Sequence, residues 1–129
     1  MSTYGYSKHL KVSFEEAIEK TIAALKAQGF GILTDIDVRK TLREKLGVEF
    51  IRYRILGACN PPRAYQALQM EEEIGLLLPC NVIVYERKDG SVVVSAQRPT
   101  IALAVVENAS LEPLAKEVEE ILQGVVDTL

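Results

Sequence analysis

The two cysteines of the chain lie in short segments that resemble each other, Cys59-Asn60-Pro61 and Pro79-Cys80-Asn81. Each segment combines a thiol, a side-chain amide and a proline, so together they could supply a nucleophile or a redox pair. Twenty residues separate the cysteines, which excludes a C-x-x-C redox motif. The candidate site therefore consists of Cys59, Asn60, Pro61, Cys80 and Asn81.

No metal is predicted at this site. One histidine, His9, and two cysteines cannot form a standard structural zinc site within one subunit unless carboxylates complete it. The chain also lacks a glycine-rich phosphate loop, a recognisable Ser-His-Asp set and an HExxH helix. The sequence therefore does not identify a cofactor.

The thiols admit two interpretations. Free cysteines are among the most buried residues, so both could simply be small parts of an apolar core. Alternatively, Cys59 directly precedes a predicted helix, and a helix N-terminus can lower a thiol pKa and produce a reactive thiolate. Cys80 could serve as its resolving partner only if the thiols meet. They would lie roughly 20 Å apart if the next strand followed the helix directly and ran parallel, but they could approach if residues 76–79 ran back extended.

Asn60 also has a structural and a functional interpretation. It is a good helix N-cap, and Pro61-Pro62 suits a first helical turn, where a missing amide costs nothing. The same turn could instead present amide donors to a small anion or a carboxylate. Arg52 and Arg54 could add positive charge to such a site, be solvated, or pair with Glu86; we favour ion pairing. The secondary candidates are Arg52, Arg54, Glu86 and His9.

Periodicity and capping signals predict the elements that hold these residues. Ser13-x-x-Glu16 is a capping box, and the apolar stripe that follows it has helical spacing up to Gly29. Asp89-Gly90 predicts a hairpin turn. Strands are expected over residues 3–12, 30–36, 50–58, 80–87 and 91–97, and helices over 13–29, 38–46, 60–75 and from 108 or 110 onward. Residues 76–79 are predicted to form a buried apolar connection. Residues 100–106 are predicted to form a strand or a short helix.

The resulting order, β-α-β-α-β-α-β-β-α, predicts an α/β fold of the α+β-like, two-layer sandwich kind. We expect one mixed five-stranded sheet with helices mainly on one face. In residues 50–58, Tyr53 and Ile55 point one way and Arg52 and Arg54 the other. This pattern fits helices on one face and a polar or partner-covered surface on the other. Several strands are apolar on both faces, so we predict a homodimer that covers a sheet face or an edge strand.

Composition bounds the class of protein. The length fits a single domain over residues 1–129. A net charge of -3 and a pI near 5.2 argue against a nucleic-acid partner, which usually meets a basic face. No stretch approaches the roughly 20 apolar residues of a membrane span, and the first residues do not resemble a signal peptide. We expect a cytoplasmic protein with reduced thiols and no membrane partner.

Several motifs together resemble a known family. They are the segments Leu56-Gly57-Ala58-Cys59-Asn60-Pro61 and Gly75-Leu76-Leu77-Leu78-Pro79-Cys80-Asn81-Val82, followed by Val84-Tyr85-Glu86. With the helix start at residues 13–17 and the late Pro99, they resemble the family called domain of unknown function 302, found mainly in bacteria and archaea. The resemblance implies a two-layer α/β fold and a dimer, and it directs attention to Cys59, Asn60, Pro61, Pro79 and Cys80. It implies no established activity.

Three hypotheses about function follow. The first is a homodimeric, non-enzymatic module that binds a small molecule or ion near the Cys59-Asn60 turn. The second is a thiol-based redox or detoxification protein that uses Cys59 and Cys80. The third is a purely structural or interaction domain.

Overall fold

The fold is built on one antiparallel sheet. It is seen in a computed structural model that describes residues 2–129. The five strands lie in the order β1-β5-β4-β3-β2, and every neighbouring pair is antiparallel. The strands are β1 (Gly5–Leu10), β2 (Gly31–Asp37), β3 (Tyr53–Cys59), β4 (Cys80–Glu86) and β5 (Val92–Gln97). The order of the main elements is the predicted one, but the prediction of a mixed sheet is wrong.

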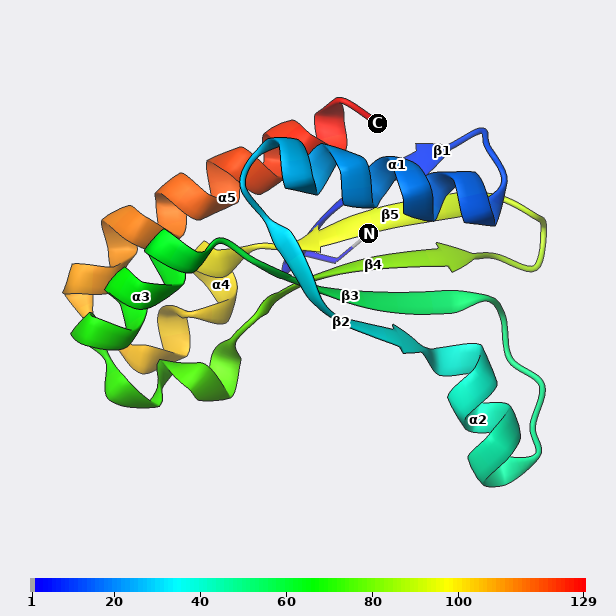
Figure 1. Cartoon of the computed structure of the whole chain (residues 1–129), viewed down its shortest axis with the longest axis horizontal. Helices are drawn as coiled ribbons and strands as arrows, with labels where there is room; N and C mark the ends of the chain where they lie inside the picture. Colours follow the sequence, from blue (N-terminus) through cyan, green and yellow to red (C-terminus); the bar gives the residue numbers. More distant parts are fainter. Residues whose placement is uncertain (1) are drawn as a thin grey trace.

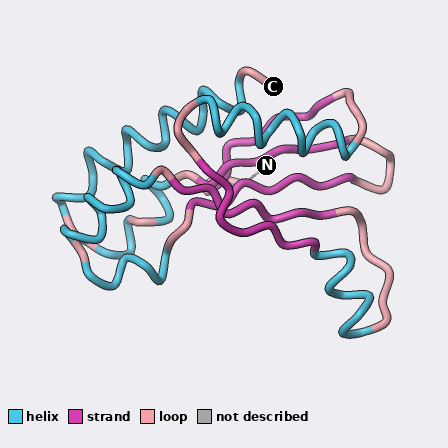
Figure 2. Tube along the Cα trace, viewed as in Figure 1, coloured by secondary structure: helices cyan, strands magenta, loops and turns pink. Residues whose placement is uncertain are grey.

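Two helices cover one face of the sheet. Figures 1 and 2 show α1 and α5 side by side over the strands, whereas α2 and α3 lie at opposite ends of the molecule. The helices are α1 (Phe14–Ala27), α2 (Val38–Leu46), α3 (Pro61–Met70), α4 (Pro99–Ala102) and α5 (Glu112–Asp127), with short 3₁₀ helices η1 (Glu72–Leu77), η2 (Ala104–Val106) and η3 (Ala109–Leu111). Of the helices in residues 2–129, none is long and apolar enough to cross a membrane.

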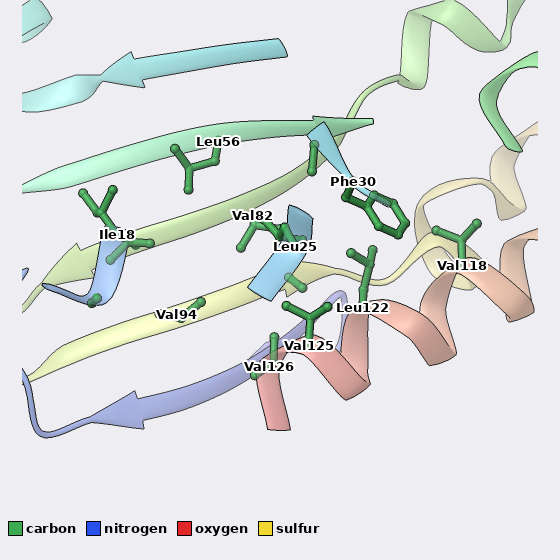
Figure 3. Close-up of a cluster of buried hydrophobic side chains, with 14 of the residues drawn as sticks. Ile18, Leu25, Phe30, Leu56, Val82, Val94, Val118, Leu122, Val125 and Val126 are labelled. Carbon is green, nitrogen blue, oxygen red and sulfur yellow. The ribbon is translucent and has the colours of Figure 1, made fainter. Parts of the chain in front are cut away.

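The hydrophobic core lies between the sheet and these two helices (Figure 3). Leu56, Val82 and Val94 project from three neighbouring strands, Leu25 from α1 and Leu122 from α5, and all are fully buried. Because alternate strand residues point to opposite faces, this row fixes which face of each strand meets the helices. Burial of the row against two amphipathic helices is the main source of stability of the fold.

The predicted helix caps and hairpin turn are present. Ser13 Oγ accepts a hydrogen bond of 3.1 Å from the backbone N–H of Glu16, which caps α1. Asp37 caps α2 in the same way through the N–H of Lys40, at 2.9 Å. Gly90, at φ +88°, closes the turn between β4 and β5, where Asp89 accepts from the N–H of Ser91. These local signals act within a few residues, so the sequence alone can specify them.

The face of β3 that was expected to be polar is turned toward the helices. Leu56 and Ala58 are buried on the helix side, and Arg54 shares their parity. Arg52, just before β3, contacts Glu15 of α1 at 2.6 Å. Tyr53 and Ile55 lie on the opposite face, which no helix covers in Figure 1. Arg52 and Arg54 reach water because they lie at the end of the sheet where α1 begins.

Some local predictions differ from the structure. Residues 76–79 are only partly a buried connection: Leu76 is 82% exposed, whereas Leu77 and Leu78 are half-buried against the core. For residues 100–106, the helical alternative is confirmed, in α4 and η2, and Pro99 suits the first helical turn. The last helix begins at Glu112, later than expected, because Asn108 caps the separate 3₁₀ turn η3 through the N–H of Ser110.

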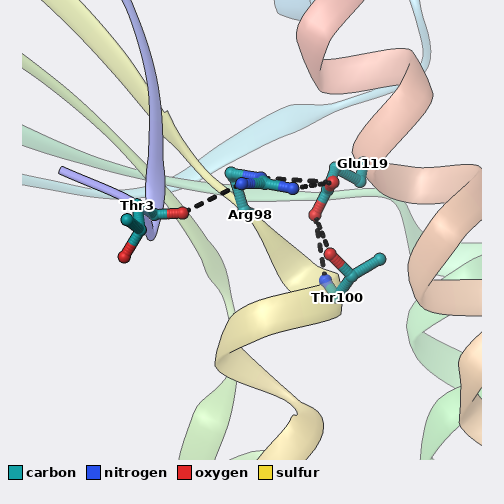
Figure 4. A network of polar contacts seen from close by, with 4 residues as sticks. All are labelled: Thr3, Arg98, Thr100 and Glu119. Atoms are coloured by element: carbon teal, nitrogen blue, oxygen red, sulfur yellow. Dashed lines mark hydrogen bonds and ion pairs between the residues drawn. The ribbon is translucent and has the colours of Figure 1, made fainter. Parts of the chain in front are cut away.

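A buried carboxylate fixes α4 against α5 (Figure 4). Glu119 accepts hydrogen bonds from the backbone N–H of Thr100 at 3.0 Å and from its hydroxyl at 2.6 Å. Arg98 donates to the same carboxylate at 3.3 Å and to the carbonyl of Thr3 at 3.0 Å. Residues from the N-terminus, the end of β5 and α5 thus meet at one charged group.

Candidate functional site

The two cysteines lie at the same end of the sheet. β3 ends at Cys59, α3 continues past the sheet edge, and η1 brings the chain back to the start of β4. β4 then runs antiparallel to β3, with Ala58 paired to Cys80. The alternative in which β4 runs parallel and the thiols lie far apart is therefore excluded. Because six residues of η1 return the chain, α3 does not act as a crossover helix.

Gly57 allows this close approach. A side chain at Gly57 would place its Cβ 2.1 Å from Oγ1 of Thr34 on β2 and 2.8 Å from Cγ of Pro79, both well inside a normal contact. The Leu78–Pro79 peptide bond is cis. Gly57 and Pro79 thus pack directly on each other where β3 meets the start of β4, next to both cysteines. This contact gives a physical reason for the glycine in the Leu56-Gly57-Ala58-Cys59 segment.

An apolar cavity of about 320 Å³ opens beside the cysteines. Phe30 and Ala58 line it from the sheet side, Ala64 and Ala67 from α3, and Val118 from α5. Ala115 of α5 also lines the cavity. The cavity exists because α3 carries small side chains toward α5 and extends beyond the sheet, so no strand residue fills the space between them. Its size is at the lower end of the range of about 300–1,000 Å³ for small-molecule sites.

The wall of the cavity contains few polar groups. Cys59, Asn60, Cys80 and Arg63 lie in it, and Arg63 is its only charged residue. Asn60 is only 8% exposed, and its Oδ1 accepts from the N–H of Arg63 at 3.2 Å. The structure therefore brings Cys59, Asn60 and Cys80 together. Pro61 is an exposed first residue of α3 and Asn81 is exposed on β4, so neither lines the cavity.

The N-terminus of α3 has no free backbone donor in its first turn. Pro61 and Pro62 have no N–H, the N–H of Arg63 is bonded to Asn60 Oδ1, and that of Ala64 is bonded to the Asn60 carbonyl at 2.9 Å. This arrangement does not favour the interpretation in which the turn presents amide donors to an anion. Asn60 is instead the N-cap of α3, as its structural interpretation predicts.

Neither thiol is activated. Burial raises the pKa of Cys80 from 9.0 to about 11, and the neighbouring Cys59 contributes in the same direction. Burial also raises the pKa of Cys59. The prolines that follow Cys59 remove the amide donors that would otherwise stabilise a thiolate at a helix N-terminus. Both cysteines are therefore neutral near pH 7 and behave as small, polarisable apolar side chains.

Slow alkylation is the expected consequence. At pH 7, Cys80 is expected to react with iodoacetamide on the order of a hundredfold more slowly than free cysteine, whose pKa is near 8.5. Its rate should keep rising up to about pH 11, the pKa that burial imposes. The rates are measured by mass spectrometry of the alkylated peptides, with free cysteine as the reference. A rate that already reaches its plateau below pH 7 at either cysteine would show an activated thiolate and support the redox hypothesis.

The secondary candidates lie away from this cavity. The pairing of Tyr53 with Tyr85 is five residues along the strands from that of Ala58 with Cys80, which corresponds to about 17 Å. Arg52, Arg54, Glu86 and His9 all lie toward this distant end of the sheet.

Each of the cations there has an ionic partner. Arg52 contacts Glu15 at 2.6 Å and Glu86 at 3.8 Å. Arg54 forms a two-pronged ion pair with Asp35. His9 is exposed on the edge strand β1. Within residues 2–129 no three His, Cys, Asp or Glu side chains gather as a metal site would require.

Sequence reasoning missed Arg63, the charged residue of the cavity. Its side chain crosses from α3 to α5, where Nη2 contacts Glu117 at 2.5 Å. The signal in the sequence was weak: a single cation beside the alanines of the predicted third helix. Ala64 and Ala67 give that helix a small-residue side, but the volume that they leave open depends on α5.

A family model described as "Domain of unknown function DUF302" matches residues 6–129, nearly the whole chain. The chain belongs to the DUF302 family. The crystal structure of an uncharacterized conserved DUF302 protein from Bacillus stearothermophilus is similar, with a TM-score of 0.90 and 29% sequence identity over 98% of each chain. No curated protein matches the chain. The predicted membership of this family is thereby confirmed. Residues of both cysteine segments, Cys59, Asn60, Pro79 and Cys80, line the cavity in this DUF302 protein.

Proposed function

We propose that this DUF302 protein binds a small, largely apolar molecule in the cavity between the end of its sheet and helices α3 and α5. The observation that carries the proposal is the cavity itself, about 320 Å³ of apolar space lined by the two cysteine segments. An unfilled volume of this size loses packing energy, so the fold gains when an apolar ligand occupies it. A concave apolar site with a few polar groups is the usual form of a small-molecule site.

The proposed role is binding rather than catalysis. The cavity wall offers a single charged side chain, Arg63, and two thiols whose pKa burial has raised. A catalytic thiol would need a base, a cation or free amide donors to hold it as thiolate. Arg63 is the one cation at the cavity, and it is already paired with Glu117. These features support a binding module more than a redox protein.

A titration with N-phenyl-1-naphthylamine tests the proposal, because this probe is uncharged and fluoresces strongly only in apolar surroundings. Saturable binding to the folded protein is expected, with a stoichiometry of one probe per chain. Native mass spectrometry of freshly purified protein should show a retained small molecule or the added probe at the same stoichiometry. If the fluorescence rises only linearly with probe, as for non-specific surface contact, the proposal fails.

We also propose that a second copy of the chain covers the open sheet face. Ile36, Ile55 and Ile83 form a row across β2, β3 and β4 on this face, and Ile36 is 46% exposed. Beside them Tyr53 and Tyr85 stack, with ring centroids 5.4 Å apart. A contiguous, partly exposed apolar row is costly in a monomer, and a self-complementary contact would bury it.

The substitution Ile36→Lys is therefore expected to weaken the dimer about tenfold or more, because it introduces a charge into the apolar contact. The measurement is sedimentation equilibrium at micromolar concentration. Ile101→Lys is the matched control, since Ile101 is 45% exposed on α4, away from the sheet face. A wild-type protein that sediments as a monomer would contradict the dimer.

A further inference from the structure

The exposure of the lining residues shows where the cavity opens to water. Among the residues of 2–129 that line it, three are exposed: Leu33 of β2, Leu68 of α3 and Gly75 of η1. Leu33 is 67% exposed and Leu68 is 42% exposed. The wall is closed on the side formed by α4, η3 and α5, where Pro99 and Leu111 are buried. The cavity therefore has a mouth, which Leu33, Leu68 and Gly75 surround, and a closed apolar interior.

A β-bulge accounts for the position of Leu33 at this mouth. Ile32 pairs with Ala58 and Thr34 pairs with Gly57, the next residue of β3, so Leu33 is the extra residue of β2. A bulge breaks the regular alternation of side chains along a strand and changes where the extra side chain points. Leu33 thus lines the cavity and is exposed to water at the same time.

The mouth and the wall behind it offer a ligand apolar contact but no free charge. The mouth carries two leucines and a glycine, and the charged residue of the wall, Arg63, is already paired with Glu117. A charged group carried into the cavity would lose its hydration without gaining a free ionic partner, which is costly. Such a group is stable only in the water outside the mouth.

We propose that the ligand is an amphiphile, whose apolar chain fills the cavity and whose polar head group stays in water beyond Leu33 and Leu68. This inference rests on the proposed binding function. The two leucines contact the part of the chain that crosses the mouth, and this contact removes their own exposed apolar surface from water. Affinity then depends on the length of the chain and little on the chemistry of the head group.

Ligands with similar chains and different head groups test the inference. Decanoate, 1-decanol and decyltrimethylammonium are each measured below their micelle concentrations by displacement of N-phenyl-1-naphthylamine. Their affinities are expected to agree within about tenfold, because the same chain is buried in each case. Octanoate should bind about tenfold more weakly than decanoate, since it buries two fewer CH₂ groups.

A charge at the mouth tests where the head group lies. Compared with Leu33→Gln, the substitution Leu33→Lys is expected to strengthen decanoate about threefold and to weaken decyltrimethylammonium about threefold at low ionic strength. The uncharged 1-decanol should bind both variants equally, which shows that both are folded. Val105→Lys is the control, because Val105 is 74% exposed and does not line the cavity.

Three results would overturn the inference. They are affinities that differ by more than about tenfold among the three head groups, equal binding of octanoate and decanoate, or an effect of Leu33→Lys on the charged ligands no larger than that of Val105→Lys. In each of these cases the probe still binds, so the proposed function stands. Failure of the probe to bind the wild-type protein would instead remove the proposed function, and this inference with it.

Discussion

Replacing Ala64 by Phe is expected to abolish binding of N-phenyl-1-naphthylamine, with a loss of affinity of about a hundredfold or more. Ala64 lies on α3 and lines the cavity together with Ala115 and Val118 of α5. A phenyl ring at this position would occupy much of the roughly 320 Å³ that the ligand needs. Because Ala64 is only half-buried, the ring can enter existing space without displacing the packed core.

The control for this substitution lies two positions away on the same helix. Gln66 is exposed and outside the cavity, so Gln66→Phe adds the same ring without filling the space. This variant is expected to bind the probe as the wild-type protein does. Thermal unfolding should show that both variants remain folded. Unchanged probe binding by the Ala64→Phe variant would place the probe elsewhere and would contradict the proposed site.

Glu119→Gln is expected to lower the free energy of unfolding by about 2 kcal/mol near pH 7. The carboxylate accepts two hydrogen bonds from Thr100 and further ones from Arg98, while only 8% of the residue is exposed. A glutamine keeps the shape, but it has one acceptor oxygen in place of two, so its NH2 group must face either the donors of Thr100 or those of Arg98, and the guanidinium loses its charged partner. Urea unfolding measures the change. Glu120→Gln, on the adjacent exposed residue, should change stability by less than about 0.5 kcal/mol.

The effect of Glu119→Gln should depend on pH. Burial by itself would raise the pKa of Glu119, but the hydrogen bonds from Thr100 and Arg98 outweigh it, so its pKa in the folded protein lies below the ordinary value of 4.5. A depressed folded pKa means that the unfolded chain binds the proton more readily. The stabilisation is thus fully present above pH 4.5 and is lost as the pH falls through the folded pKa. The difference between the two proteins should shrink in acid, and a difference that is constant from pH 7 to pH 3 would contradict this.

Short-range features of the fold could be predicted from sequence. Ser13 and Asn60 cap helices, Asp89-Gly90 forms a hairpin turn, and Gly47 ends α2 in the left-handed conformation, as each residue type predicts. A cap or turn is a contact between residues two to four positions apart, so chain geometry alone brings the partners together. The family of the chain could also be predicted, from the resemblance of the two cysteine segments and the residues around them to that family.

The direction of β4 was not predictable in this way. Only six residues of η1 decide whether the chain returns along α3, and the sequence pattern divides them between a predicted helix over 60–75 and a predicted connection over 76–79. The 3₁₀ turn forms because Ile74 is buried against the core while Leu76 can face water. Helix and extended conformations of so short an apolar run differ little in intrinsic energy, so contacts with distant residues decide between them.

By itself, the sequence determined the order of the elements, the caps of α1 and α2, the family and the two segments to watch, Cys59-Asn60 and Pro79-Cys80. Only the tertiary structure decided that these segments meet, that their thiols have raised pKa values, and that Arg63 lies beside them in an apolar cavity. The reason is physical. Caps and periodicity act along the chain, whereas burial, desolvation and cavity volume arise between elements that the chain brings together from far apart.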